Sequence, residues 1–150
     1  MMTTEPEVQI NLTKEQHKAL VELVYLGHWM ATAIHEKPIK KYDDVEQLVF
    51  SHAKRAGLQN CVDYDDEMKM YFTLRKFEES ELWPIKEDYD DYTFWDELAH
   101  RLADRDMFQQ SGDLEIAKMP EKLRKLRNSL ITKYEDESAE HGVDRLKIAE

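Results

Sequence analysis

The stretch Thr13–Ile34, TKEQHKALVELVYLGHWMATAI, decides the fold of this chain. Thr13 and Gln16 stand three residues apart, the spacing of a capping box in which each side chain accepts a hydrogen bond from the other residue's backbone N–H. Apolar residues then recur at helical spacing: Leu20, Leu23, Val24, Gly27, Met30, Ala31 and Ile34. The pattern predicts an amphipathic helix that ends before Pro38.

A second apolar arc on the same segment predicts that this helix is central. It consists of Val21, Tyr25 and Trp29. A helix with apolar surface on two sides contacts neighbours on both, so we expect Leu23 and Met30 to be buried. Gly27 costs about 1 kcal/mol relative to alanine inside a helix. We therefore expect it to mark the close approach of another helix.

Helical spacing of apolar residues continues in the rest of the chain, and no alternating stretch of useful length predicts a strand. We expect further helices over 43–56, 65–82, 93–108 and 120–141. Gly57 is placed to end the first of these in a left-handed conformation, and Pro120 is placed to begin the last. Trp95 and Leu98 are expected in the core. The predicted fold class is all-α.

The predicted architecture is one domain, a bundle of four to five helices over residues 1–150. The segments 1–12 and 143–150 are expected to be peripheral tails. The chain has 150 residues and 41% hydrophobic residues, which is typical of a globular protein and not of a disordered one. No apolar run approaches the roughly 18 residues of a membrane span. Cys61 is the only cysteine, which excludes an internal disulfide. We expect a cytoplasmic monomer or small homo-oligomer.

The net charge of −11 comes from one third of the chain, because residues 63–115 hold 17 acidic and 6 basic residues. Within this third, the segment Glu87–Glu97, EDYDDYTFWDE, mixes carboxylates with aromatic rings. Such a segment repels nucleic-acid phosphates and attracts basic partners. We expect it to be a connector that leads into the helix capped by Thr93. The predicted partner-binding residues are Asp88, Tyr89, Asp90, Asp91 and Tyr92.

The favoured function is therefore a non-catalytic module, protein-binding or regulatory, whose partner is a basic protein. An alternative is a metal-dependent hydrolase built on Asp96, His100 and Asp104, which recur at i, i+4 and i+8. Glu67 is the candidate carboxylate from another helix. The same helix carries pairs such as Glu97 and Arg101, which are typical of an ordinary solvated face.

No motif in the sequence supports a metal or a cofactor, and we expect neither. On the first helix His17 and His28 lie about 16 Å apart along the axis, too far for one ion. The helical nucleotide pyrophosphohydrolases hold magnesium with a Glu-Glu-x-x-Glu motif, and the spacing in Glu78–Glu81, EESE, does not match it. The HEPN ribonucleases place a histidine shortly after Arg-Asn, whereas Thr132 stands at that position after Arg127 and Asn128. Neither family's residues are therefore assigned to this chain.

A basic stretch lies at the start of the last predicted helix. Its cations are Lys118, Lys122, Arg124, Lys125 and Arg127. Positive charge in the first turns opposes the helix macrodipole, so we expect the acidic residues of this same protein to compensate it. Self-association through this helix is a third possible role for the chain.

Overall fold

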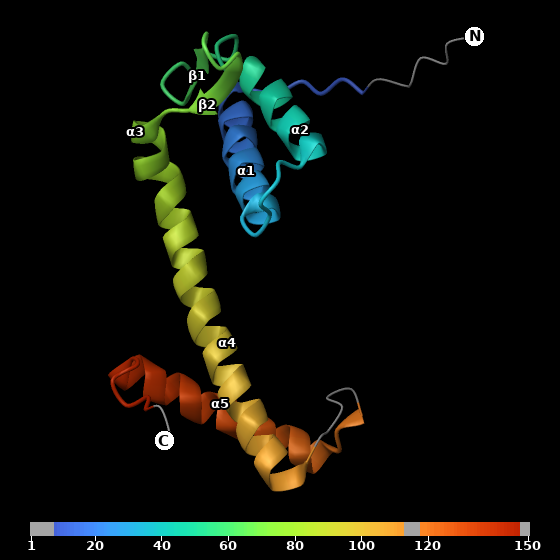
Figure 1. Cartoon of the computed structure of the whole chain (residues 1–150), viewed down its shortest axis with the longest axis vertical. Coiled ribbons are helices and arrows are strands. Elements are labelled where there is room, and N and C mark those ends of the chain that lie inside the picture. Colours follow the sequence, from blue (N-terminus) through green and yellow to red (C-terminus); the bar gives the residue numbers. More distant parts are fainter. Residues whose placement is uncertain (1–7, 113–117, 148–150) are drawn as a thin grey trace, which may run out of the picture. The chain divides into compact units, whose positions relative to one another are not determined.

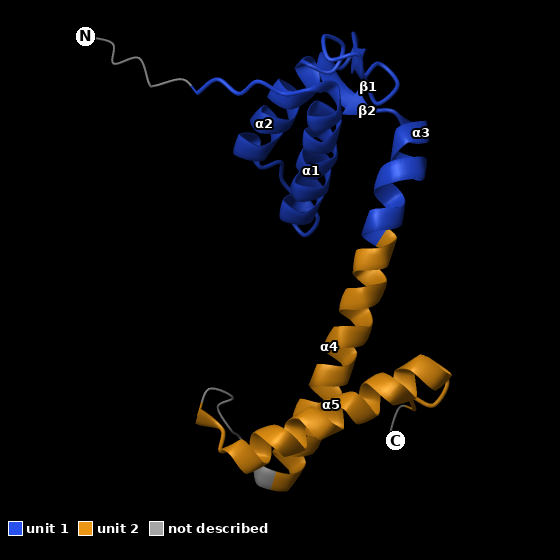
Figure 2. Cartoon of the chain, turned by 180° about the vertical axis from the view of Figure 1, so that it is seen from behind, with its two compact units in different colours: residues 1–86 blue, residues 87–150 orange. Residues whose placement is uncertain are grey.

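The structure is a computed structural model that describes residues 8–112 and 118–147. Helices hold 66% of the described residues and strands hold 6%, so the predicted all-α class is confirmed. The chain divides into two compact units (Figures 1 and 2), and the single domain expected from the sequence stays a prediction. We call residues 1–86 the N-terminal unit and residues 87–150 the C-terminal unit, and describe each by itself.

Two helices, α1 (Lys14–Thr32) and α2 (Lys40–Ser51), pack together in the N-terminal unit. The predicted capping box of α1 is confirmed, since the Thr13 hydroxyl accepts from the Gln16 N–H at 3.2 Å and the Gln16 side chain accepts from the Thr13 N–H at 2.9 Å. The second helix begins earlier than predicted, after Ile39, and ends at Ser51.

A β-hairpin, β1 (Val62–Asp65) and β2 (Met70–Thr73), follows α2. The strands are antiparallel, with Val62 opposite Thr73 and Asp65 opposite Met70. The helix predicted from residue 65 is therefore wrong as far as residue 73. Asp65 turns the chain, because its Oδ1 accepts from the backbone N–H groups of Glu67 and Met68 at 2.7 and 2.8 Å.

After the hairpin the chain becomes helical through α3 (Arg75–Phe77) and the π-helical turn η1 (Glu78–Leu82). The helix α4 (Trp83–Ser111) continues directly from η1 and begins in this unit, with Pro84 as its second residue. The core of the unit is formed by Val21, Phe50, Ala53, Leu58, Cys61, Val62, Phe77 and Leu82.

The predicted burial of Leu23 and Met30 is wrong, because these side chains are 67% and 55% exposed. The buried arc of α1 is the other one, on which Val21 lies in the core with Val24 and Tyr25 packed against it. A Cβ placed on Gly27 would meet no described atom within 4 Å. The predicted close approach at Gly27 is therefore also wrong within the described residues.

The C-terminal unit consists of α4 from residue 87 onward and α5 (Glu121–His141). The prediction of a connector followed by a helix capped at Thr93 is wrong, since Glu87–Glu97 is helical throughout. No glycine or proline interrupts residues 85–111, so the helix continues without a break. Pro120 precedes α5, and Gly142 ends it with a positive φ of 56°.

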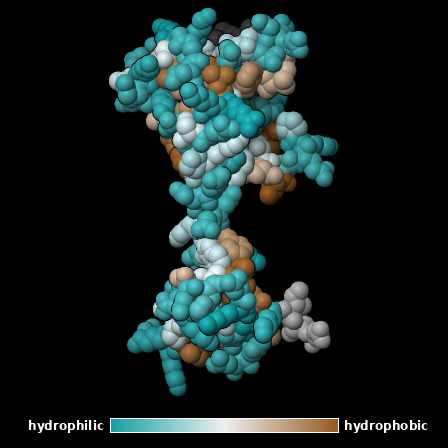
Figure 3. All heavy atoms as spheres, turned by 90° about the vertical axis from the view of Figure 1, so that its left-hand side faces the viewer, coloured by the Kyte–Doolittle hydropathy of each residue, from teal (hydrophilic) through white to brown (hydrophobic). Residues whose placement is uncertain are grey.

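Small residues of α4 meet apolar residues of α5 in the core of this unit. Ala99 and Ala103 are fully buried and Ile131 is 9% exposed, with Leu130 and Tyr134 packed against them. Trp95 and Leu98, which were expected in the core, are half-buried. Apolar side chains also reach the surface of the chain (Figure 3). Among the described helices none is long and apolar enough to cross a membrane.

Candidate functional site

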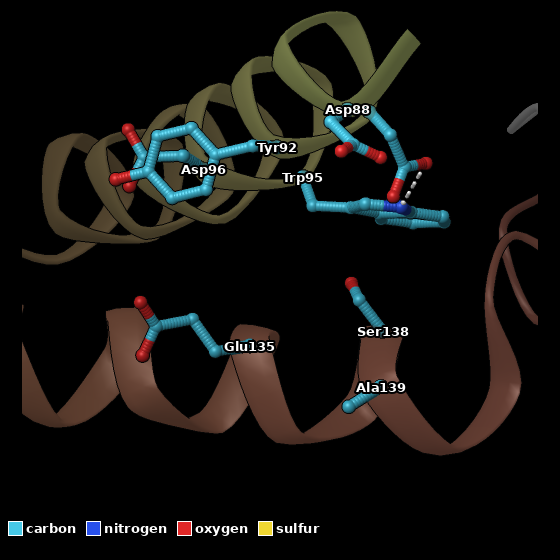
Figure 4. Close-up of a pocket in the computed structure, with 8 residues that line it drawn as sticks. Asp88, Tyr92, Trp95, Asp96, Glu135, Ser138 and Ala139 are labelled. Atoms are coloured by element: carbon cyan, nitrogen blue, oxygen red, sulfur yellow. Dashed lines mark hydrogen bonds between the residues drawn. The ribbon is translucent and has the colours of Figure 1, made fainter. Parts of the chain in front are cut away.

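A groove of about 530 Å³ lies in the C-terminal unit, between α4 and α5 (Figure 4). We call it the acidic–aromatic groove. Its lining residues are Asp88, Asp91, Tyr92, Trp95 and Asp96 of α4 with Glu135, Ser138 and Ala139 of α5. A volume of this size is within the range of small-ligand sites in proteins.

The α4 wall follows from helical geometry. Positions 88, 91, 92, 95 and 96 are related by steps of three and four residues, which place side chains on one face of a helix. The same face therefore carries three carboxylates and two aromatic rings. The segment forms a wall only because α4 continues through it without a break.

Trp95 is held in place from several directions. Its Nε1 donates a hydrogen bond to Asp91 Oδ1 at 3.0 Å, and its ring lies against Phe94 with the centroids 4.8 Å apart. A Cβ on Gly142 would lie 3.9 Å from Trp95 Cη2, so the far edge of the indole reaches the end of α5. Figure 4 shows the ring between Asp88 on its own helix and Ser138 on the facing helix. The indole therefore has a fixed orientation in the groove.

Tyr92 lies at the other end of the groove and is 68% exposed. Figure 4 shows its ring beside Asp96, with Glu135 on the facing helix. The two aromatic rings thus stand at separate points along the groove, each with carboxylates next to it.

The groove carboxylates have no ion-pair partner among the described residues. Asp91 accepts the hydrogen bond from Trp95, while Asp88, Asp96 and Glu135 have no side-chain hydrogen bond there. Some carboxylates of the same unit outside the groove are paired, and Arg127 donates two hydrogen bonds to Asp104 at 2.5 and 3.1 Å. The same is true of Glu97 with Arg101, Asp106 with Arg105, and Glu137 with Arg145. Four carboxylates without an ion-pair partner among the described residues therefore line one groove together with two aromatic rings.

This arrangement is suited to a cation that has an alkyl or planar body. A lysine ammonium or arginine guanidinium is attracted to the face of an aromatic ring and to carboxylates. The aromatic rings supply apolar contact area for the methylene groups of such a side chain. Neighbouring negative charges raise the rate at which a positive ligand arrives.

The predicted partner-binding residues divide into two groups. Asp88, Asp91 and Tyr92 line the groove, whereas Tyr89 and Asp90 are exposed on α4 outside it. Sequence reasoning missed Trp95, Glu135 and Ser138 as members of the site. The available signal was the three- and four-residue spacing from Asp88 to Asp96, which would have placed Trp95 on this face if the segment had been read as a helix.

The residues of the alternative hydrolase site do not form a ligand cluster. Asp96 lines the groove, His100 is half-buried outside it, and Asp104 is bound to Arg127. Glu67 lies in the hairpin turn of the N-terminal unit. In residues 8–112 and 118–147 no group of three or more His, Cys, Asp and Glu residues is placed to hold a metal ion.

The histidines of α1 have structural contacts. His17 lies 3.2 Å from the carbonyl oxygen of Val49. His28 lies between two carboxylates of α2, with Nε2 2.7 Å from Asp43 Oδ1 and Nδ1 3.6 Å from Glu46 Oε1. These contacts join α1 to α2 and account for both side chains without a ligand.

The basic stretch at the start of α5 is compensated in part by the protein itself. Arg127 pairs with Asp104, and Lys125 lies 3.7 Å from Glu121. Arg124 donates to the carbonyl oxygen of Met119 at 3.0 Å.

No protein family, curated protein sequence or solved structure matches this chain.

Proposed function

We propose that this protein is a non-catalytic, regulatory binding module that captures a basic segment of a partner protein in the acidic–aromatic groove. The observation that carries the proposal is the set of four carboxylates, without ion-pair partners among the described residues, around Tyr92 and Trp95. A basic side chain would supply the compensating charge and cover the exposed ring of Tyr92. The negative charge of the groove carboxylates also disfavours binding of nucleic acid.

The two kinds of groove residue have different tasks in this proposal. The carboxylates attract the basic segment, so they govern mainly the association rate and its dependence on salt. The aromatic rings hold a lysine or arginine side chain by direct contact, so they govern mainly the dissociation rate. Trp95 is already oriented by Asp91, which limits the entropy lost on binding.

The proposal includes a cellular setting and an assembly state. A lone buried cysteine, Cys61, suits a cytoplasmic protein, because that compartment keeps thiols reduced. Burial raises the pKa of the Cys61 thiol, which favours an inert side chain. The module acts as a monomer or small homo-oligomer, and its partner is a protein, not a membrane.

Binding kinetics with matched variants test the proposal. The probe is a fluorescent peptide rich in lysine and arginine, compared with a peptide that carries glutamine in their place. Tyr92→Ala removes a groove ring, and Tyr89→Ala removes a ring outside the groove. Asp88→Lys reverses a groove charge, and Asp90→Lys makes the same charge change on the same helix outside the groove.

We expect Tyr92→Ala to speed dissociation and Asp88→Lys to slow association and weaken its salt dependence. Tyr89→Ala and Asp90→Lys should change each rate by less than about threefold, as is usual for residues outside a binding site. Equal effects of the groove and control variants would show that the peptide responds to the general charge of α4. No binding, or equal binding of the glutamine peptide, would contradict the proposal.

A further inference from the structure

The helix α1 presents an apolar face to solvent in the N-terminal unit. Leu23 is 67% exposed, Met30 is 55% exposed and Ile34, just beyond the helix end, is 88% exposed. Ala19, Gly27 and Ala33 are also exposed, and Leu26 is half-buried. This face lies opposite the arc of α1 that carries the core residue Val21, so the fold of the unit does not account for it.

The spacing on this face is that of a helix–helix contact. Ala19, Leu23, Leu26, Met30 and Ala33 are separated by alternating steps of four and three residues, the repeat by which one helix packs along another. The charged residues of α1 lie outside this series, and two of them, Lys18 and Glu22, are 3.5 Å apart. A helix docked here would therefore meet an uncharged strip.

The strip is complementary in size to itself when two copies lie antiparallel. If Leu23 faces Met30 of a second copy, then Ala19 faces Ile34, Gly27 faces Leu26 and Ala33 faces Leu20. Each of these last pairs joins a small residue to a large one. The space beside Gly27 is open, since a Cβ there would meet no described atom within 4 Å, and it can receive a leucine side chain.

A parallel pair would lack this complementarity. Gly27 would then face Gly27 and leave a void, and Glu22 would lie near Glu22 of the other copy, which is unfavourable for like charges. In the antiparallel pair, Glu22 lies near Ala31, and the two helix dipoles oppose each other. With Leu23 opposite Met30, the distribution of small, large and charged residues therefore favours an antiparallel pair of copies over a parallel one.

We propose that a second copy of this chain occupies the apolar face of α1, as an antiparallel homodimer with its two-fold axis beside Leu26 and Gly27. The inference concerns the N-terminal unit and does not depend on the acidic–aromatic groove. The strip is about 24 Å long and buries less than the about 800 Å² that each partner contributes to a standard interface. The dimer is therefore reversible.

Sedimentation equilibrium of the full chain tests the dimer between about 10 µM and about 1 mM, the range of weak interfaces. We expect the mass to rise from one chain toward two. Leu23→Glu and Met30→Glu should each hold the mass at one chain throughout. The matched control is Leu48→Glu on α2. Leu48 is 61% exposed and lies outside the strip, so this variant should dimerise like the wild type.

Gly27→Lys separates loss of the interface from loss of the fold. Lysine favours a helix more than glycine does, so this variant should unfold at or above the wild-type temperature at low concentration while failing to dimerise. A mass of one chain for the wild type at every concentration would overturn the proposal. A dimer that survives Leu23→Glu, or that Leu48→Glu weakens equally, would also overturn it.

Disulfide formation tests the direction of the pair. Leu23→Cys protein mixed with Met30→Cys protein should form the mixed disulfide at least tenfold faster than either forms its own. Cys61 is buried and does not compete. Faster formation of the Leu23→Cys homodisulfide would overturn the antiparallel arrangement.

Discussion

Trp95 Nε1 donates a hydrogen bond to Asp91 Oδ1 at 3.0 Å, one turn earlier on α4. The carboxylate therefore has two roles, since it orients the indole and also contributes negative charge to the acidic–aromatic groove. The orientation exists before any ligand arrives. The groove is thus preorganised on one wall, which favours affinity by reducing the entropy lost on binding.

Two substitutions of Asp91 distinguish orientation from charge. Asp91→Asn keeps an acceptor for the indole N–H, whereas Asp91→Ala removes both acceptor and charge. The bond that Asn keeps is a neutral one, worth about 0.5–1.5 kcal/mol, so we expect Asp91→Ala to weaken binding of a lysine-rich peptide by about two- to tenfold more than Asp91→Asn does. Fluorescence anisotropy measures this, with Asp90→Ala as the control. Equal losses for both Asp91 variants would mean that the hydrogen bond has no role in binding.

Two glycines should respond to alanine with opposite signs. Gly142 has a φ of 56° and a ψ of −131°, a conformation that costs other residues about 1–3 kcal/mol. Gly27 lies inside α1 with open space around it, where alanine is favoured by about 1 kcal/mol. Thermal unfolding should therefore show a lower midpoint for Gly142→Ala and a higher one for Gly27→Ala. A decrease for Gly27→Ala would mean that another group packs closely against Gly27.

The contact between Arg127 and Asp104 should stabilise the C-terminal unit more than an exposed pair does. The Arg127 side chain is 14% exposed and its guanidinium donates two hydrogen bonds, whereas the Lys125 side chain is 77% exposed. We expect Arg127→Ala to lower the free energy of unfolding by about 1–2 kcal/mol. Lys125→Ala should cost less than about 0.5 kcal/mol. Urea unfolding measures both, and equal losses would contradict this assignment.

The parts of the fold that the sequence predicted depend on local chemistry. The capping box at Thr13, the start of α5 after Pro120 and the helical class each follow from residues a few positions apart. The hairpin at 62–73 was missed because its signal is the turn at Asp65, which interrupts an apolar pattern that is also compatible with a helix. Local patterns therefore identified helices better than they identified a short turn between strands.

The site could be predicted only in part, for a different reason. The sequence pointed to the acidic and aromatic residues from Asp88 to Tyr92, but a groove also needs a second wall. Glu135 and Ser138 lie more than 40 positions later and are brought to this wall by the packing of Ala99 and Ala103 against α5. On α1 the sequence showed two apolar arcs, and the choice of the buried arc depended on residues far away in the chain.

The pKa of Glu46 predicts a pH-dependent stability in the N-terminal unit. Burial raises this pKa, while the nearby charge of His28 opposes the shift and that of Asp43 adds to it. Because the pKa of Glu46 is higher in the folded state, this residue contributes most favourably to the free energy of unfolding at pH values below its pKa in the unfolded chain. That contribution is lost as pH rises through the pKa of the folded state. Glu46 should therefore lower the stability as pH rises above the ordinary glutamate pKa of about 4.3.

Glu46→Gln removes this titration. Its free energy of unfolding, relative to the wild type, should increase from pH 4 to pH 7, as measured by urea unfolding at each pH. Glu36→Gln, at an exposed position, serves as the control and should show no such change. A constant difference between Glu46→Gln and the wild type would contradict the role of burial.

Binding of a basic segment in the acidic–aromatic groove is the central claim, and the indole N–H signals in a ¹H–¹⁵N spectrum test it most directly. The chain has 3 tryptophans, and Trp95→Phe identifies the signal from the groove. On titration with a lysine- and arginine-rich peptide, the Trp95 signal should shift and saturate, while those of Trp29 and Trp83 stay in place. The glutamine-substituted peptide should shift none of the three. If the lysine- and arginine-rich peptide binds and leaves the Trp95 signal unchanged, the groove is not the binding site.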